Sequence, residues 1–267
     1  MRTLLAVIAV LGCDHGSPPG ATDLGASLRV PTVANHGLIA LDPALPMVVV
    51  TPTGIVIDGK AIEAVSGGDV DPADKEGGAL GLTIPRVRDF MKAFAAEQVK
   101  RGTPAAAVTL AIDPTTPYHL LVEVMFSLKQ AGMHRFVIGV RAGSALEGIP
   151  IELPESAPPR AEKQLGMFVT LAKAHVQVWS ISGEEGTLKA PALDVPAGRV
   201  ADVQKTLEDI ADRRWHGAPR ADVDRQIVVM ADSTTSMQQV ADVMVAVRTR
   251  ADGSELFPTL LLSSGIE

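Results

Sequence analysis

Two aspartates are the side chains best placed for acid–base chemistry. Asp113 stands in the tetrapeptide DPTT, and Asp232 stands in DSTT, 119 residues later. Two carboxylates that share a proton perform the chemistry of the two-lobed aspartic proteases. Both tetrapeptides lack the glycine of that protease motif, and each precedes a helix pattern instead of more strand. We therefore expect each carboxylate to accept backbone N–H bonds at a strand end and to favour the dipole of the following helix.

A second pattern is similar to a phosphate-binding loop. GIVIDGKA, Gly54 to Ala61, satisfies the first seven positions of that motif, but Ala61 stands where the motif needs the hydroxyl that holds Mg²⁺. The segment Ile55 to Ile57 favours a strand, whereas a phosphate cradle needs glycines whose N–H groups converge. We predict no nucleotide site here.

Patterns for metal binding and for nucleophilic catalysis are also incomplete. Asp69, Asp71 and Asp74 are spaced partly like a calcium loop, but Ala73 breaks the alternation and no glutamate closes it. A solvated acidic loop fits better. No GxSxG motif is present, and the histidines never reach metal-ligand spacing. These six are His15, His36, His119, His134, His175 and His216. The sequence thus predicts no catalytic residue, no metal and no cofactor.

The chemistry that the sequence does predict is lipidation near its start. A one-charge segment precedes LLAVIAVL, Leu4 to Leu11, which is too short to cross a bilayer that needs about 20 residues. Cys13, the only cysteine, follows Gly12 where a bacterial lipoprotein signal is cut. We expect a signal peptide over 1–13 and a lipid on Cys13, because an unpaired cysteine in an exported chain needs an explanation. A plain signal peptide with a buried thiol is the alternative.

Composition excludes some classes of partner and structure. Hydrophobic residues make up 46% of the 267 and charged residues 21%, which suits a packed core and not wholesale disorder. The net charge is −7, and no basic cluster with interleaved aromatics occurs. We therefore expect no nucleic-acid partner.

The segment Val108 to Arg141 predicts one β-α-β unit. Strand residues end at Asp113-Pro114, Thr116 is the expected N-cap with Pro117 in the first helical position, and Gly132 ends the helix. The helix should bury one apolar face, and a second strand should follow. The predicted face consists of Leu121, Val124, Met125 and Leu128.

The same unit recurs at an offset of 119 residues. In Ile227 to Val247, Asp232 corresponds to Asp113, and an apolar helix face falls on the face of the first copy. That second face consists of Val240, Val243, Met244 and Val247. Two copies of one fold are the simplest account. The alternative is that any two β-α units look alike at this level.

We therefore predict an α/β (α+β) chain with two tandem two-layer β-β-α-β-α-β sandwich domains. Helices are expected near residues 84–101 and 197–214, and residues 66–81 should form a mobile loop. The expected order is a signal over 1–13, a flexible tether over 14–46, domain one over 47–141, a proline-rich linker over 142–163 and domain two over 164–267.

Domain one contains a set of residues that match a known family pattern. They are Gly54, Asp58, Gly59, Asp113, Pro117-Tyr118, Val122, Val124-Met125, Leu128 and Ala131-Gly132. Through them, domain one resembles the periplasmic domain of the ExbD/TolR family of proton-driven envelope motors, over about 95 residues. Domain two resembles it more faintly, through Asp232, Val243-Met244 and the helix face.

The resemblance, the export signal and the absence of catalytic clusters in the sequence together lead us to expect a non-enzymatic periplasmic lipoprotein. The membrane helix of the family, with its proton-carrying aspartate, is missing, and the lipid anchor stands in its place. The part of the family architecture that this chain retains is the soluble domain. In the family this domain dimerises and binds envelope proteins or peptidoglycan, so two copies on one chain could pair as that dimer. Implied partners are ExbB/TolQ-like motor subunits or TonB/TolA-like proteins, with the chain as accessory or scaffold in biopolymer transport. The alternative is a binding module for a peptide, a glycan or a small ligand between the domains.

Overall fold

The computed structural model describes residues 28–34, 37–102, 106–153, 165–172, 174–215 and 226–263. The expected signal peptide and Cys13 lie outside these residues. Within them, none of the helices combines the length and the apolar character that a membrane crossing requires.

The first half begins with three antiparallel strands. β2 (Met47–Thr51) and β3 (Gly54–Ile57) form a hairpin, and β4 (Lys60–Ala64) pairs with β3. Asp58 and Gly59 make the second turn with φ of 46° and 78°, as a tight two-residue hairpin turn requires. The expected order has only two strands here. Lys and Glu disfavour strands in isolation, so β4 depends on this turn and on its pairing with β3.

Two short 3-10 helices, η1 (Pro72–Asp74) and η2 (Gly78–Leu80), then lead to α2 (Pro85–Lys100). The predicted unit follows as β5 (Ala107–Ile112), α3 (Tyr118–Gln130) and β6 (Arg135–Ala142), with β5 and β6 parallel. The four residues of the predicted α3 face are buried, and Gly132 has the left-handed φ of 94°. The sequence prediction for this unit is confirmed to within a residue or two.

The second half repeats this plan. β8 (Met167–Ala172), β9 (His175–Ser180) and β12 (Leu193–Pro196) are antiparallel neighbours, with a small hairpin of β10 (Gly186–Thr187) and β11 (Ala190–Pro191) between β9 and β12. α4 (Val200–Trp215), β13 (Gln226–Ala231), α6 (Met237–Arg248) and β14 (Thr259–Leu262) complete it. Both halves therefore have the order β-β-β-α-β-α-β, and the sheet order within each is the same.

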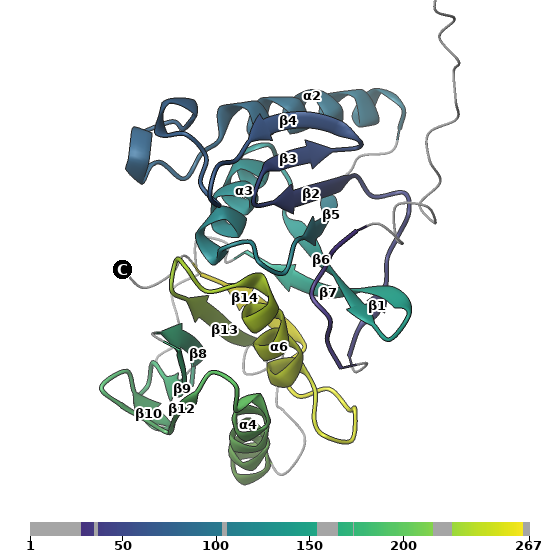
Figure 1. Cartoon of the computed structure of the whole chain (residues 1–267). Helices are drawn as coiled ribbons and strands as arrows, with labels where there is room; N and C mark the ends of the chain where they lie inside the picture. Colours follow the sequence, from purple (N-terminus) through teal and green to yellow (C-terminus); the bar gives the residue numbers. More distant parts are fainter. Residues whose placement is uncertain are drawn as a thin grey trace, which may run out of the picture.

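One mixed sheet contains both halves. Its order is β12-β9-β8-β13-β14-β7-β6-β5-β2-β3-β4, and β1 (Ile39–Ala40) adds to β7 (Ala145–Glu152). Figure 1 shows the first half above the second, with β7 and β14 between them. The buried apolar side chains of both halves belong to one cluster. The fold is therefore mixed α/β (α+β), and the two halves share a sheet and a core.

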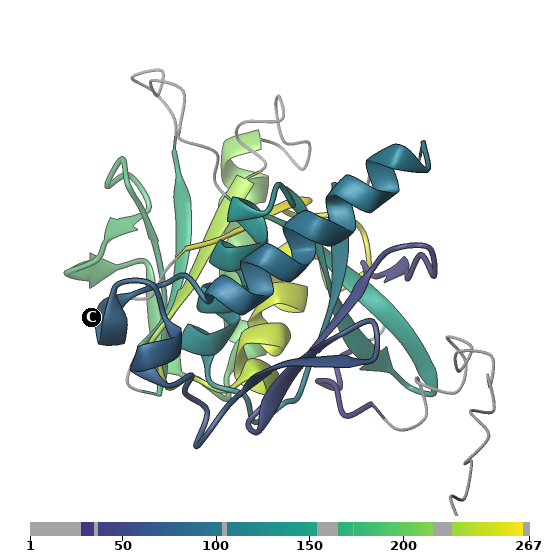
Figure 2. The same cartoon turned by 90° about the horizontal axis from the view of Figure 1, so that it is seen from above.

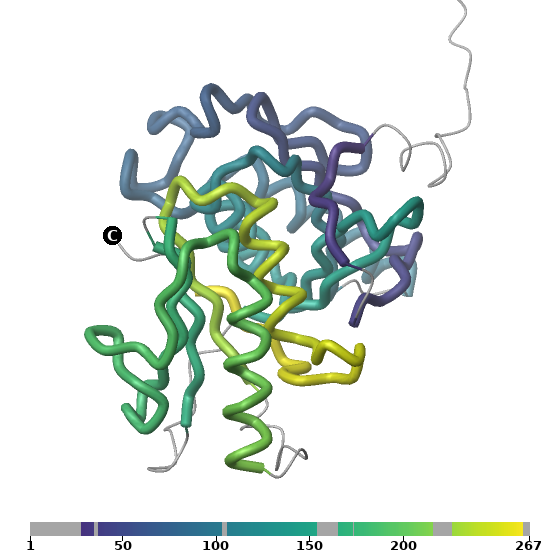
Figure 3. The backbone as a smooth tube through the Cα atoms, turned by 60° about the horizontal axis from the view of Figure 1, so that its bottom comes forward, coloured from purple at the N-terminus to yellow at the C-terminus, as the bar shows by residue number. Residues whose placement is uncertain are grey.

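The helices pack in pairs against this sheet. α2 lies over α3 in the first half, as the view from above shows (Figure 2). In the second half α4 runs beside α6 (Figure 3). α4 contacts β9 and β12, whereas α6 contacts β13 and β14. This leaves the other face of these four strands without a covering helix among the described residues.

The prediction of a linker over residues 142–163 is wrong for residues 142–153, most of which form β7. β7 pairs with β6 along its whole length, from Arg135 opposite Glu152 to Ala142 opposite Ala145. Pro150 and Gly148 weaken the strand pattern in the sequence, but a tight turn after β6 brings the segment back onto the sheet edge. The remaining residues of the expected linker lie outside the described part of the chain.

The tether expected over residues 14–46 is also wrong for its described residues. Val30 and Val33 are buried, and the backbone of Thr32 exchanges two hydrogen bonds with the side-chain amide of Gln238, at 3.0 and 2.8 Å. Val33 N–H donates to the carbonyl of Arg141 at 2.9 Å. The segment is thus held by both halves.

Candidate binding site at the junction of the two halves

The loops that follow β5 and β13 hydrogen-bond to each other. Tyr118 N–H donates to Thr235 O at 2.8 Å, and Met237 N–H donates to Thr116 O at 3.0 Å. His119 N–H donates to Ser233 O, and Gln238 N–H donates to Pro114 O, both at 3.1 Å. Each donor and each acceptor has its counterpart 119 residues away. The two loops are therefore related by a local two-fold axis that passes between Pro117 and Ser236, which form an antiparallel bridge.

This pairing caps both helices. The first N–H groups of an α-helix have no partner within the helix, so something else must accept their hydrogen bonds. Here the loop carbonyls of one half accept them from the helix of the other half. Separating the halves would leave the first N–H groups of α3 and α6 without these acceptors. Each half therefore depends on the other to complete its helix cap.

Thr116 is not the N-cap of α3, as the sequence had suggested. Pro117 takes that position with extended backbone, and Ser236 does the same for α6, where its hydroxyl accepts from Gln239 N–H. Thr116 is buried, and its hydroxyl has no hydrogen-bond partner. The N-cap is thus one residue later than predicted. The carbonyl of Thr116 instead accepts a hydrogen bond from Met237 N–H of the other loop.

Asp113 plays the predicted structural role. Its Oδ1 accepts from the backbone N–H of Thr115 at 2.9 Å and from the Thr115 hydroxyl at 2.6 Å, while Oδ2 lies 3.6 Å from Arg29 Nε. The side chain is buried, and the partners of its oxygens are the N–H and hydroxyl of Thr115 and the guanidinium of Arg29. The backbone of Asp232 makes the hydrogen bond equivalent to that of Asp113. Asp113 N–H donates to Val50 O and Asp232 N–H donates to Leu171 O, both at 2.8 Å.

Tyr118 ties α3 to the second half. Its buried hydroxyl donates to the carbonyl of Ser263, at the end of β14, at 2.5 Å. Burial raises the pKa of the Tyr118 phenol well above its ordinary value. His119 adds a third link, because its Nδ1 lies 2.9 Å from Ser233 O and its Nε2 lies 2.7 Å from Asp69, without hydrogen-bond alignment.

The other residues of the family resemblance lie away from the junction. Asp58 and Gly59 form the β3–β4 turn, where Asp58 Oδ1 accepts from Met47 N–H at 2.9 Å. Gly132 ends α3. The structure therefore brings Asp113, Pro117, Tyr118 and Asp232 to one place and leaves Asp58, Gly59 and Gly132 in local turns. The apolar residues of the resemblance, Val122, Val124-Met125 and Leu128, lie on α3. Cys13 lies outside the described residues.

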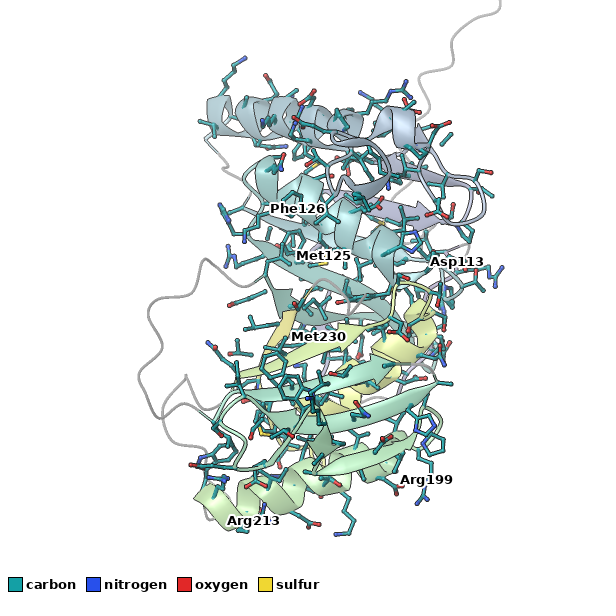
Figure 4. The ribbon with its side chains drawn as sticks, turned by 90° about the vertical axis from the view of Figure 1, so that its left-hand side faces the viewer. Asp113, Met125, Phe126, Arg199, Arg213 and Met230 are labelled. Carbon is teal, nitrogen blue, oxygen red and sulfur yellow. The ribbon has the colours of Figure 1, made fainter. Side chains whose placement is uncertain are left out.

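A pocket opens where α3 meets the end of β14. Its volume is about 210 Å³. Apolar side chains form most of the wall, namely Leu82, Val122, Met125, Phe126, Leu153 and Leu262. Lys129 and Ser263 are the polar members. Phe126 is 37% exposed and lies on the outer side of α3 (Figure 4). This volume lies below the range of about 300–1,000 Å³ for small-molecule pockets and suits one large apolar side chain better.

An ion pair and two hydrogen bonds join the segment before α2 to α3, beside this pocket. Lys75 Nζ lies 2.9 Å from Glu123 Oε1, and both side chains are buried. Gln130 Nε2 donates to Thr83 Oγ1 at 2.9 Å, and Ile84 N–H donates to Ser127 Oγ at 2.8 Å. The loop expected to be mobile over residues 66–81 is therefore held on α3 at its C-terminal end, next to Leu82.

The pocket can make mainly apolar contacts with a partner. No group of three or more His, Cys, Asp or Glu side chains in the described ranges could hold a metal ion. The pocket residues are apolar apart from one cation and one hydroxyl. In comparisons with known proteins, no family model, no curated protein and no solved structure matches the chain.

Sequence reasoning missed the pocket, although one signal was present. Val122 and Phe126 lie four residues apart on α3 and outside the predicted buried face. A helix with a second apolar stripe has a second surface to cover. The positions of Leu153 and Leu262 could not be predicted in the same way, because they depend on how β7 and β14 meet.

Proposed function

We propose that the chain is a non-enzymatic scaffold of the bacterial cell envelope, in which two ExbD/TolR-like repeats form the equivalent of a dimer within one polypeptide. A lipid on Cys13 anchors it, and it acts as an accessory of an energy-transduction or biopolymer transport system. Its partners are envelope proteins, such as ExbB/TolQ-like motor subunits or TonB/TolA-like proteins, and peptidoglycan is a further candidate.

The pairing of the two loops carries this proposal. Homodimers commonly have two-fold symmetry, in which each subunit presents the same surface to the other. In the four junction hydrogen bonds, each donor and acceptor has an equivalent 119 residues away. The two repeats are therefore related by a local two-fold axis, as the subunits of a homodimer are. A chain that contains both partners needs no second copy to satisfy this junction. Its remaining surfaces are then available to other proteins.

The pocket favours protein partners over a glycan. A glycan site needs several hydrogen-bonding groups, whereas six of the pocket residues are apolar. Well-packed interface pockets commonly take a large anchor side chain such as Trp or Tyr from a partner protein. The second candidate function is a module that binds a peptide at the junction. The apolar pocket favours it as well, and it differs from the scaffold only in that the partner is a short peptide and not a folded protein.

Site-specific crosslinking tests the proposal. The full-length chain is expressed in a bacterium with two membranes, with a photo-crosslinking amino acid in place of Phe126. We expect adducts with envelope or motor-type membrane proteins, and none when the same amino acid replaces the exposed Val99 on α2. The proposal would be contradicted if no such adduct forms and the chain either converts a soluble substrate or is labelled by an active-site probe. Mass spectrometry of the N-terminal peptide checks the lipid on Cys13 separately.

A further inference from the structure

Residues 28–34, which we call the strap, lie against the end of β6 and beside α6. Arg141 N–H donates to Pro31 O at 2.8 Å, and Val33 N–H donates to Arg141 O at 2.9 Å. A guanidinium N–H of Arg141 donates to Leu28 O at 3.4 Å. In Figure 3 the purple start of the described chain runs close to α6, in yellow-green. The strap therefore adds to β6 in the way that a short parallel strand does.

The second half binds the strap through one side-chain amide. Gln238 Oε1 on α6 accepts from Thr32 N–H at 3.0 Å, and Gln238 Nε2 donates to Thr32 O at 2.8 Å. Nε2 also donates to Asp242 Oδ1 at 2.9 Å. A carboxylate accepts this bond only from an N–H group, so Asp242 fixes which end of the amide faces each backbone group of Thr32. Gln238 is thus oriented to bind the backbone of one residue of an extended chain.

These hydrogen bonds all end on the backbone of the strap. When a protein adds an extended peptide to a sheet, backbone hydrogen bonds give the affinity, and sites for alternate side chains give the specificity. Val30, Pro31 and Val33 are buried, whereas Arg29 and Thr32 are exposed. The strap is therefore bound as a peptide ligand is, with its apolar side chains covered and its backbone held.

Two strap residues narrow the sequence that fits this site. Arg29 Nε lies 3.6 Å from Asp113 Oδ2, and the Asp113 side chain is 8% exposed against 74% for Arg29. A basic residue at this position therefore meets a largely buried carboxylate from the solvent side. Pro31 contributes only its carbonyl, so its missing N–H costs nothing, and its fixed φ lowers the entropy that an extended ligand loses on binding. The site thus fits a basic residue followed by apolar, proline, any and apolar residues.

The strap is attached less firmly than the strands of the sheet. It meets β6 in one isolated bridge, whereas β5 pairs with β6 from Ala107 to Ala111. Segments that are held by few backbone hydrogen bonds open at a lower free energy than the core. The hydrogen bonds between the two loops at the junction are made without the strap. The strap can therefore leave its site while the two halves stay joined.

We propose that the strap site binds an extended peptide of a partner protein and that the strap occupies it as an intramolecular competitor. The peptide has a basic residue, an apolar residue, proline, any residue and a second apolar residue in that order, as residues 29–33 have. The inference goes beyond the proposed function, because this surface is separate from the pocket at α3 and needs neither a lipid anchor nor an envelope partner.

A peptide that copies the strap provides the test. Its sequence is LRVPTVA, residues 28–34, with a fluorescent label, and anisotropy measures its binding to the full-length chain. The strap of the same chain competes at an effective concentration on the order of millimolar, so the native chain should bind the peptide weakly. In the Thr32→Pro variant the strap lacks the N–H that Gln238 accepts. This variant should bind the peptide about tenfold more tightly, because its competitor has lost one hydrogen bond.

Matched substitutions assign the binding to the strap site. Thr32→Pro in the peptide should weaken its binding, although the same change in the chain strengthens it. Gln238→Ala keeps the backbone hydrogen bond to Pro114 O but removes the amide, so it should weaken peptide binding to the Thr32→Pro chain at least about tenfold. Arg29→Glu in the peptide should weaken binding in a salt-dependent manner. Val99→Asp, on the exposed side of α2, should leave the affinity unchanged.

Val30→Asp gives a second way to release the strap, because it places a charge at a buried apolar position. If this variant does not fold, Thr32→Pro alone decides. The inference is overturned if neither strap variant binds the peptide more tightly than the native chain, if a scrambled peptide binds equally well, or if Gln238→Ala leaves binding unchanged. Crosslinks from position 126 test the proposed function separately, so failure of the peptide with such crosslinks present rejects only the strap site.

Discussion

Pro117 and Ser236 face each other across the junction as N-caps of α3 and α6, with φ and ψ of −72° and 149° for one and −72° and 150° for the other. A proline and a serine thus hold the same backbone conformation 119 residues apart. Proline fixes φ near this value and has no N–H to satisfy, while serine caps its helix with its hydroxyl. The repeat preserved the geometry of the junction and not its side chains.

Tyr118→Phe should destabilise the protein. The change removes the hydroxyl that donates to Ser263 O, so this partly buried carbonyl loses that hydrogen bond. We expect a loss of about 1–2 kcal/mol in the free energy of unfolding, measured by urea denaturation. Thr53→Ala, which removes an exposed hydroxyl, should change it by less than about 0.5 kcal/mol. Equal effects of the two substitutions would show that Tyr118 does not link the halves.

The same tyrosine should make stability depend on alkaline pH. Its native pKa is raised above the ordinary value of 10.0, so above that pH the unfolded chain binds fewer protons than the native one. Stability from this group is present below pH 10.0 and is lost as the pH rises above it. The chain has one tyrosine, so tyrosinate absorbance reports on it alone. We expect this absorbance to appear only with unfolding, and ordinary titration in the folded protein would contradict the burial.

Lys75→Met should be far more damaging than removal of a surface cation. It leaves Glu123 buried without its partner, which costs about 3–5 kcal/mol. Lys205→Met breaks the exposed pair with Asp209, which solvent screens, so it should change the stability far less than Lys75→Met does. Thermal or urea unfolding of both variants measures the difference.

The double variant Lys75→Met/Glu123→Leu gives the matching control. It removes both charges, so it should recover part of the stability that Lys75→Met loses. If the double variant is as unstable as the sum of its single variants, then the two side chains do not interact as an ion pair.

Asp113 should tolerate an amide but not an alanine. Asp113→Asn keeps an oxygen that accepts from Thr115 N–H, so stability should fall by less than about 1 kcal/mol. Asp113→Ala leaves that N–H without its acceptor and should cost about 1–2 kcal/mol. In the crosslinking experiment both variants should keep their envelope partners. Loss of function in Asp113→Asn at unchanged stability would point to a chemical role for the carboxylate.

Local elements could be predicted from the sequence because local patterns specify them. The apolar face of α3 recurs at helical spacing, and its buried residues were predicted correctly, as were the strands on either side. β7 and β4 were missed, because Gly148, Pro150 and Lys60 weaken their strand patterns and their formation depends on pairing with β6 and β3.

The site could be predicted only in part. The similar loops at Asp113 and Asp232 predicted that the halves are repeats. They did not predict that the loops cap each other's helices, since no local pattern encodes a contact over 119 residues. The pocket needs Phe126 on α3 and Leu262 on β14 to meet, although 136 residues separate them in the sequence. These features arise from tertiary pairing, which the pattern of one segment does not contain.

Native-state hydrogen exchange of the four amides that bridge the two loops tests the central claim most directly. These amides belong to Tyr118, His119, Met237 and Gln238. If the halves form one scaffold through reciprocal capping, all four exchange with a common opening free energy, close to that of global unfolding. Fast exchange at these amides, or separate opening energies for the two helices, would contradict the account.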